Sequence, residues 1–128
     1  MPKDNKQIYI VDDDASVCRA LSMMLTLYGF TVDTFNSTDE FISAVPKGSP
    51  GCLILDIHMP GFDGWESQRH LLISESSRPV IIISADKDET FKEKALKAGA
   101  AGYLQKPFND HALVDFINGA LEKKAAKR

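Results

Sequence analysis

Short apolar runs recur along the chain and predict five β-strands. The runs occupy residues 8–11, 32–35, 52–55, 80–83 and 102–104. Several of them are continuously apolar rather than alternating, which is typical of parallel strands that helices cover on both faces. The pattern therefore favours a parallel sheet buried between two layers of helices.

Between these runs, apolar residues at spacings of three and four predict helices. The inward face of the first helix is predicted to comprise Val17, Ala20, Leu21, Met24, Leu25 and Tyr28. Gly29 follows this helix at a position typical of a C-cap. Gly99 stands in the same relation to a helix predicted from about Asp88 to Ala98.

The other helices carry N-terminal capping signals. Ser37 and Glu40 fit a capping box. The apolar residues that follow this box are Phe41, Ile42 and Val45. Asn109 or Asp110 caps the last helix. The residues of that helix predicted to face inward are Leu113, Phe116, Ile117, Ala120 and Leu121. Strand and helix thus alternate five times, (βα)5, which predicts an α/β fold with a doubly wound three-layer sandwich around a five-stranded parallel sheet.

The composition is that of an ordinary soluble globular domain. The chain has 128 residues, of which 44% are hydrophobic and 26% charged, and its formal net charge is -3. This length predicts one domain over residues 1–128, with a core from about residue 6 to 123. Because there is no basic excess, we expect no direct nucleic-acid binding by this domain.

No segment predicts export or membrane insertion, so we expect a cytoplasmic protein that does not bind membranes. The N-terminal residues have no apolar h-region, and the longest aliphatic run, Val80 to Ile83, is too short to cross a bilayer. Cys18 and Cys52 lie far apart and form no CxxC pair. We interpret them as reduced thiols that act as small buried hydrophobic residues.

Reactive side chains gather where the predicted strands end, and ligands bind at the carboxyl ends of the strands in doubly wound sheets. The residues at these ends are Asp12, Asp13, Asp14, Asp56, Ser84 and Lys106. Taken singly, each aspartate also fits a helix cap or a turn. Together, several carboxylates at one edge repel one another, and Mg²⁺ with its preference for oxygen ligands resolves that repulsion. A lysine and a hydroxyl would then hold the oxygens of a phosphate group.

These residues lie in motifs that resemble the receiver domain of two-component response regulators. The motifs are Ile10-Val11-Asp12-Asp13-Asp14, Leu55-Asp56-Ile57-His58-Met59-Pro60-Gly61, Asp63-Gly64, Ile83-Ser84-Ala85, Lys97-Ala98-Gly99-Ala100 and Lys106-Pro107-Phe108. The resemblance covers nearly the whole chain and implies a flavodoxin-like, chemotaxis-type fold with strand order 2-1-3-4-5. The segment that begins at Met59 also resembles regulators that carry a C-terminal helix-turn-helix domain.

The resemblance implies a role for each residue of the site. Asp56 would be the phosphoacceptor and Lys106 the lysine that binds the phosphate. Ser84 would be the switch hydroxyl, where threonine is more frequent in the family, and Tyr103 the aromatic switch. The implied ligands of Mg²⁺ are Asp12, Asp13, Asp56 and the backbone carbonyl of His58.

The resemblance also implies a reaction and its partners. A sensor histidine kinase or a phosphotransfer protein would donate the group from a phosphohistidine, which leaves an acyl phosphate on Asp56. The chain would then be a signalling module that catalyses its own phosphorylation and slow dephosphorylation, and not a turnover enzyme. The readout would be a face formed by the fourth helix, fifth strand and fifth helix, open to a partner or to homodimerisation. A cis peptide bond between Lys106 and Pro107 would aim the lysine at the site.

Three other classes of protein fit parts of the pattern. A magnesium-dependent phosphatase of the haloacid-dehalogenase type also uses an aspartyl nucleophile, but it needs a second acid two positions later, where this chain has His58. A flavin carrier would place its phosphate among three acids, and Trp65 fits helix packing or a position near the acidic site better than flavin stacking. The scattered positions of His58, His70 and His111 argue against a phosphohistidine carrier.

Overall fold

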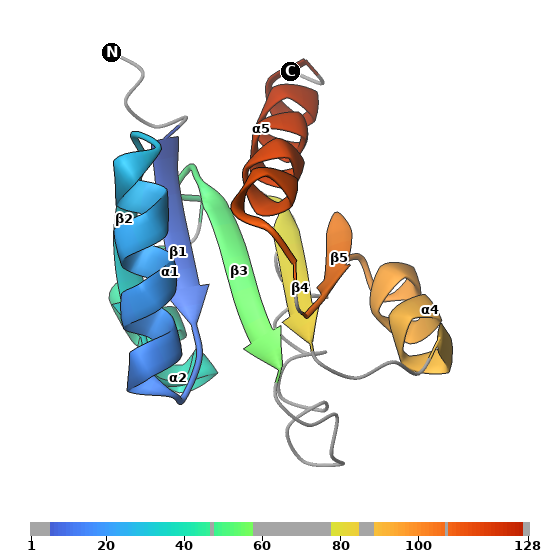
Figure 1. Ribbon diagram of the computed structural model, residues 1–128, viewed down its shortest axis with the longest axis horizontal. Helices are drawn as coiled ribbons and strands as arrows, with labels where there is room; N and C mark the ends of the chain where they lie inside the picture. Colours follow the sequence, from blue (N-terminus) through green and yellow to red (C-terminus); the bar gives the residue numbers. More distant parts are fainter. Residues whose placement is uncertain (1–5, 47, 58–77, 85–88, 107, 127–128) are drawn as a thin grey trace.

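The centre of the molecule is a five-stranded sheet whose neighbouring strands all run parallel. The computed structural model describes residues 6–46, 48–57, 78–84, 89–106 and 108–126. The strands are β1 (Gln7–Val11), β2 (Thr31–Phe35), β3 (Cys52–Ile57), β4 (Val80–Ser84) and β5 (Gly102–Gln105). Their order across the sheet is β2-β1-β3-β4-β5 (Figure 1), which confirms the predicted α/β fold.

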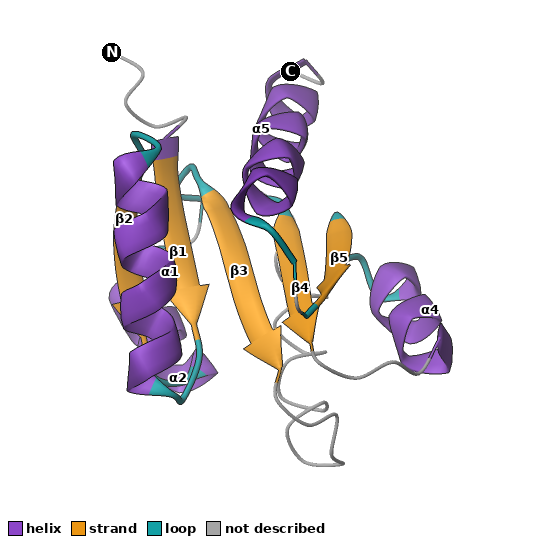
Figure 2. Ribbon diagram, viewed as in Figure 1, coloured by secondary structure: helices purple, strands orange, loops and turns teal. Residues whose placement is uncertain are grey.

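Helices cover both faces of this sheet. They are α1 (Ala15–Leu27), α2 (Thr38–Ala44), α4 (Glu89–Lys97) and α5 (Asp110–Ala126). Residues of α1 and α5 share one core cluster, whereas α2 and α4 contribute to the cluster on the other face. In Figure 2, α1 and α5 lie in front of the strands and α2 lies behind them. The helix expected between the third and fourth strands falls within residues 58–77, outside the described residues.

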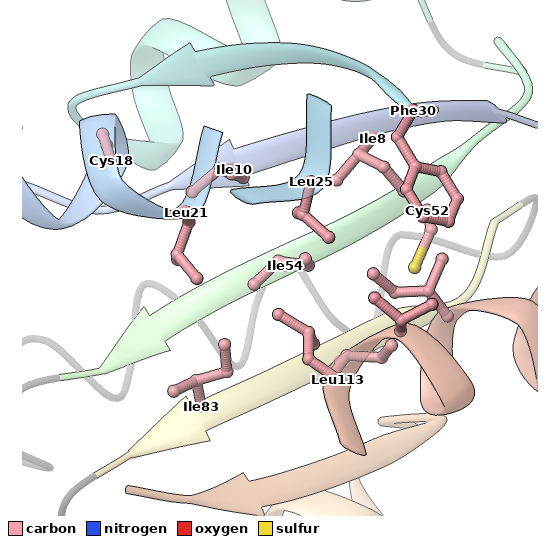
Figure 3. Packing of buried hydrophobic residues seen from close by; sticks show 13 residues of the cluster. Ile8, Ile10, Cys18, Leu21, Leu25, Phe30, Cys52, Ile54, Ile83 and Leu113 are labelled. Atoms are coloured by element: carbon pink, nitrogen blue, oxygen red, sulfur yellow. The ribbon is translucent and has the colours of Figure 1, made fainter. Parts of the chain in front are cut away.

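Alternate residues of the three central strands fill the two faces of the sheet. The set that packs with α1 and α5, seen from close by in Figure 3, comprises Ile8, Ile10, Cys52, Ile54, Ile81 and Ile83. The set on the opposite face comprises Tyr9, Val11, Leu53, Leu55, Val80 and Ile82. All of these side chains are buried. The apolar runs of these strands are continuous in sequence because both faces are covered.

The predicted caps of α2 and α5 are present. Ser37 Oγ accepts a hydrogen bond from the Glu40 N–H at 3.1 Å. The Glu40 carboxylate accepts from the Asn36 N–H at 2.8 Å, one residue earlier than in an ideal capping box. At α5 the cap is Asn109, whose Oδ1 accepts from the Ala112 N–H at 2.8 Å. Local side-chain chemistry therefore sets where both helices begin.

The predicted inward face of α1 was partly wrong. Cys18, Leu21 and Leu25 are buried, whereas Ala20 and Tyr28 are exposed. The buried side chains follow the spacing i, i+3, i+7 from Cys18. Alanine has a small side chain, so it fits on the buried or on the exposed side of a helix. Gly29 follows the helix with a φ of 96°, as the predicted C-cap requires.

Two other apolar residues of the predicted helices are exposed, of which Phe116 was predicted to face inward. Ile42 on α2 is 58% exposed, and Phe116 on α5 is 39% exposed. On α2, Phe41 takes the buried position instead. On α5, Val114 is buried, and the Phe116 ring lies over Gly102 of the edge strand β5, where one side of the ring meets solvent.

The prediction for the cysteines is confirmed, since Cys18 and Cys52 are both free and buried. No helix in the described part of the chain is long and apolar enough to span a membrane.

Candidate functional site

The candidate residues lie at the carboxyl edge of the sheet, where the four strands β1, β3, β4 and β5 end. Asp12 directly follows β1 and Lys106 directly follows β5. Strands β3 and β4 extend further than the apolar runs predicted, so Asp56 lies within β3 and Ser84 ends β4. Backbone pairing across these strands aligns Asp56 with Ile83, and Ile57 with Ser84. The fold thus brings residues far apart in sequence to one edge, as predicted.

The backbone around Asp12 is fixed by hydrogen bonds on both sides. Its N–H donates to the Phe35 carbonyl at the end of β2, at 3.0 Å. Its side chain Oδ1 accepts from the Asp14 N–H, also at 3.0 Å. Asp12 is only 2% exposed, whereas the neighbouring Asp13 is exposed. The acidic pair therefore has one anchored, buried member and one member that faces solvent.

Asp14, the third acid of the run, acts as a helix cap. Its Oδ1 accepts hydrogen bonds from the Ser16 N–H at 2.9 Å and from the Ser16 hydroxyl at 2.7 Å. The same side chain also accepts from the Val17 N–H. These bonds satisfy donors at the start of α1 that have no partner within the helix. Asp14 thus begins α1, and the acidic site comprises Asp12, Asp13 and Asp56.

Asp56 and Lys106 form an ion pair. The distance from Lys106 Nζ to Asp56 Oδ2 is 2.9 Å, and the side chains are 29% and 0% exposed. The Lys106 backbone N–H also donates to the Ser84 carbonyl at 2.8 Å, which ties the end of β5 to the end of β4. This arrangement places a flexible cation beside a carboxylate that water cannot reach, which is suited to binding an anionic group at Asp56.

The other oxygen of Asp56 supports a cation site. Oδ1 is buried and accepts no hydrogen bond from the described residues. A buried carboxylate oxygen without a donor is costly, and a hard cation such as Mg²⁺ would satisfy it. No three His, Cys, Asp or Glu side chains among the described residues form a ready-made metal cluster. Mg²⁺ typically binds one or two carboxylates and keeps several waters, so the residues present fit this ion.

The Cys18 thiol reports on the electrostatics of the site. Burial raises the pKa of Cys18, and the negative charges of Asp12, Asp56 and Asp14 raise it further. A thiol responds in this way because its deprotonated form would be a further anion in a negative field. Asp12, Asp56 and Asp14 therefore lie close enough to Cys18 to place its thiol in a negative field.

The structure places Ser84 and Tyr103 near this edge but in different surroundings. Ser84 is fully buried at the end of β4. Tyr103 on β5 is 9% exposed and belongs to the cluster that includes Ala95 of α4. Tyr103 thus packs inward in this structure. His58, Trp65, His70 and the peptide bond before Pro107 lie outside the described residues.

Two buried residues have contacts that the sequence did not reveal. Cys18 Sγ donates a hydrogen bond to the Asp12 carbonyl at 3.4 Å. Arg78 is only 3% exposed, and its guanidinium lies 5.2 Å from the centroid of the Tyr9 ring and 5.4 Å from that of Phe41. The Cys18 contact could have been found from the position of Cys18, six residues after Asp12 and on a helix that packs against the sheet. For Arg78, the preceding polar segment gave no signal.

Comparison with known proteins identifies the family. A model of the response regulator receiver domain matches residues 8–118. The chain belongs to this family, whose members are the receiver domains of two-component systems and act in signalling by phosphorylation. Receiver domains generally bind Mg²⁺ in an acidic pocket, in agreement with the acidic edge described above.

Relatives of known name and structure share this domain. The response regulator protein TodT of Pseudomonas putida is 39% identical over 121 residues, which cover 94% of this chain and 53% of TodT. The transcriptional regulatory protein FixJ of Bradyrhizobium diazoefficiens is 35% identical over 116 residues, 91% of this chain and 57% of FixJ. The chain thus spans about half the length of these curated relatives. The crystal structure of a receiver protein from Burkholderia phymatum has a TM-score of 0.74 and 44% identity, and covers 91% of this chain and 94% of that one.

Proposed function

We propose that this chain is a phosphorylation-activated switch in which Asp56 accepts a phosphoryl group from a histidine kinase or a phosphotransfer protein. The observation that carries this proposal is the position of Asp56. Its carboxylate is fully buried at the carboxyl edge of the sheet, 2.9 Å from Lys106 Nζ, and its Oδ1 accepts no hydrogen bond from the described residues. Membership of the receiver family supports the same role.

In the proposed transfer, a carboxylate oxygen of Asp56 forms a bond to phosphorus while the bond from phosphorus to the donor imidazole breaks. The imidazole leaves with the electron pair and takes up a proton, and an acyl phosphate remains on Asp56. Lys106 would bind one phosphoryl oxygen through its ammonium group, and Ser84 would donate its hydroxyl to another. Positioning and electrostatic stabilisation supply most of the catalysis in such a reaction.

We propose that Asp12, Asp13 and Asp56, with the backbone carbonyl of His58, hold Mg²⁺. When bound, the ion neutralises charge that develops on the phosphoryl oxygens. Asp12 is held by its hydrogen bonds to Phe35 and Asp14, so its carboxylate is oriented before any ligand arrives. Asp13 faces solvent and could exchange the ion together with its waters.

The phosphorylated state would be read on the face formed by α4, β5 and α5. Ser84 and Lys106 are joined through the backbone at the ends of β4 and β5, so a movement at Ser84 would reach this face directly. A partner protein or a second copy of the chain would bind there. We propose that residues 1–128 form one receiver domain with its core at about residues 6–123, and that this domain makes no contact with nucleic acid.

Phosphorylation with a small-molecule donor tests this function. Incubation with acetyl phosphate and Mg²⁺ should add one phosphoryl group to the parent, measured by intact-mass spectrometry, and a chelator should prevent the addition. Asp56→Asn should remain unlabelled. The matched control is Asp39→Asn, which removes an exposed carboxylate in the first turn of α2 and should label like the parent. Full labelling of Asp56→Asn would contradict the proposal.

A further inference from the structure

Cys18 lies between the acidic site and the hydrophobic core. It is the fourth residue of α1 and is 6% exposed. Figure 3 shows it at the end of the core cluster toward which β3 and β4 run, with Cys52 toward the opposite end. Its thiol donates a hydrogen bond to the Asp12 carbonyl at 3.4 Å. This bond joins α1 to the residue that directly follows β1.

The peptide units on both sides of Asp12 are therefore held by different elements. The Asp12 N–H donates to Phe35 at the end of β2, and the Asp12 carbonyl accepts from Cys18 on α1. The carbonyl of Asp12 belongs to the same peptide unit as the N–H of Asp13. A donor that fixes this carbonyl therefore also limits rotation of the backbone from which the Asp13 side chain projects.

We infer that Cys18 is a positioning residue, which orients the Asp12–Asp13 backbone so that both carboxylates can bind Mg²⁺ next to Asp56. This inference rests on the proposed function. Cys18 acts through Asp12 and does not itself touch the phosphoryl group or the ion. A thiol is a weak donor, so its removal should reduce Mg²⁺ affinity by about three- to tenfold rather than abolish binding.

The substitutions Cys18→Ala, Cys18→Ser and Cys18→Val separate the hydrogen bond from packing. Alanine and valine remove the donor, whereas serine retains one. The matched control is Cys52→Ala, because Cys52 is also buried in the same core cluster. Cys52 lies at the start of β3, four residues before Asp56, and pairs with Ile8 rather than with the acidic run.

Calorimetric titration with Mg²⁺ in the absence of any phosphodonor gives the first readout. We expect Cys18→Ala and Cys18→Val to bind Mg²⁺ about three- to tenfold more weakly than the parent. Cys18→Ser should bind within about twofold of the parent, because the hydroxyl replaces the donor. Cys52→Ala should bind like the parent even where its melting temperature falls. Equal Mg²⁺ affinity in Cys18→Ala and Cys52→Ala would overturn the inference, as would a serine variant that binds as weakly as valine.

Labelling by acetyl phosphate gives the second readout. Loss of positioning should raise the Mg²⁺ concentration for half-maximal rate in Cys18→Ala and leave the rate at saturating Mg²⁺ within about twofold of the parent. A lower saturating rate with an unchanged Mg²⁺ dependence would overturn the inference. If Cys18→Ala does not fold, the comparison of Cys18→Ser with Cys18→Val decides in the same way. Failure of the parent to become labelled despite normal Mg²⁺ binding would instead count against the proposed function.

Discussion

The ion pair of Asp56 and Lys106 combines a fully buried carboxylate with a partly exposed ammonium group. A carboxylate that is removed from water loses its hydration, and a nearby cation offsets part of that cost. The lysine head group retains access to solvent and has a flexible stem, so it can move to a new anion at low cost. The site therefore pairs its buried carboxylate with a cation that can follow the phosphoryl group.

Alkaline pH should destabilise the protein through Cys52. Burial raises the pKa of this thiol to about 12, whereas a thiol in an unfolded chain titrates near about 8.5. Between these values the unfolded chain loses a proton that the folded chain retains, so the free energy of unfolding falls as pH rises; below the unfolded pKa this effect is absent. The expected loss approaches about 1.4 kcal/mol per pH unit within that window.

Denaturant unfolding of the parent and Cys52→Ala at pH 7.5 and pH 10 checks this prediction. The stability advantage of the parent over Cys52→Ala should shrink by about 1.5 to 2 kcal/mol at the higher pH. Other groups that titrate in this range, including Cys18, are common to both proteins and cancel in the comparison. An equal fall in the free energy of unfolding of both proteins between pH 7.5 and pH 10 would show that Cys52 is not the cause.

At the scale of elements, the sequence predicted the strands and caps well because these depend on local signals. The runs of β1, β3 and β4 are apolar throughout since both of their faces are buried. The exact ends of β3 and β4 could not be predicted, because Asp56 and Ser84 are polar residues held in strands by pairing with their neighbours. The exposure of Phe116 could not be predicted either, because it depends on how α5 packs against β5.

The close approach of α5 to β5 depends on the absence of a side chain at Gly102. A Cβ atom at this position would lie 2.8 and 2.9 Å from two carbons of the Phe116 ring. Gly102→Ala should therefore force the ring from its place and destabilise the fold by about 1 to 2 kcal/mol. The penalty should be smaller in a Phe116→Leu background, where the smaller side chain leaves room.

A double-mutant cycle of Gly102→Ala and Phe116→Leu measures this coupling by denaturant unfolding. Residues in contact typically show interaction free energies of about 0.5 kcal/mol or more, whereas independent sites add. Additive effects of the two substitutions would mean that the position of the Phe116 ring does not depend on the absence of a side chain at Gly102.

In the whole molecule, the carboxyl edge of the sheet is connected to the face formed by α4, β5 and α5. Asp56 lies on β3, the central strand of the sheet. The hydrogen bond from the Lys106 N–H to the Ser84 carbonyl connects the end of β4, which neighbours β3, with the end of the edge strand β5. Figure 1 shows α4 beside β5 at this end of the sheet. Tyr103 packs inward in the cluster that includes Ala95 of α4, so a change at β5 would alter the support of α4. The family resemblance predicted these residues, whereas composition and periodicity alone could not have given Tyr103 a role.

Ser84→Ala should still accept phosphate on Asp56 but should transmit the event poorly. The hydroxyl is the group that would bind the new phosphoryl oxygen and draw the end of β4 toward it, which would bias the packing of α4 and β5. The matched control is Ser84→Thr, which retains the hydroxyl. Amide hydrogen exchange with and without a beryllofluoride mimic should show protection changes on α4, β5 and α5 in the parent and in Ser84→Thr.

In Ser84→Ala these protection changes should be largely lost, although the mimic still binds. If all three proteins respond equally on this face, the hydroxyl does not couple the site to it. If alanine lowers stability and leaves the response intact, Ser84 has only a structural role.

Chemical trapping tests whether the acyl phosphate forms on Asp56. After incubation with acetyl phosphate and Mg²⁺, borohydride reduces an aspartyl phosphate to homoserine, which peptide mass spectrometry locates in the sequence. We expect homoserine at position 56, dependent on Mg²⁺ and absent when the phosphodonor is omitted. Homoserine at Asp12 or Asp13, or a phosphoryl group retained on a histidine, would contradict it.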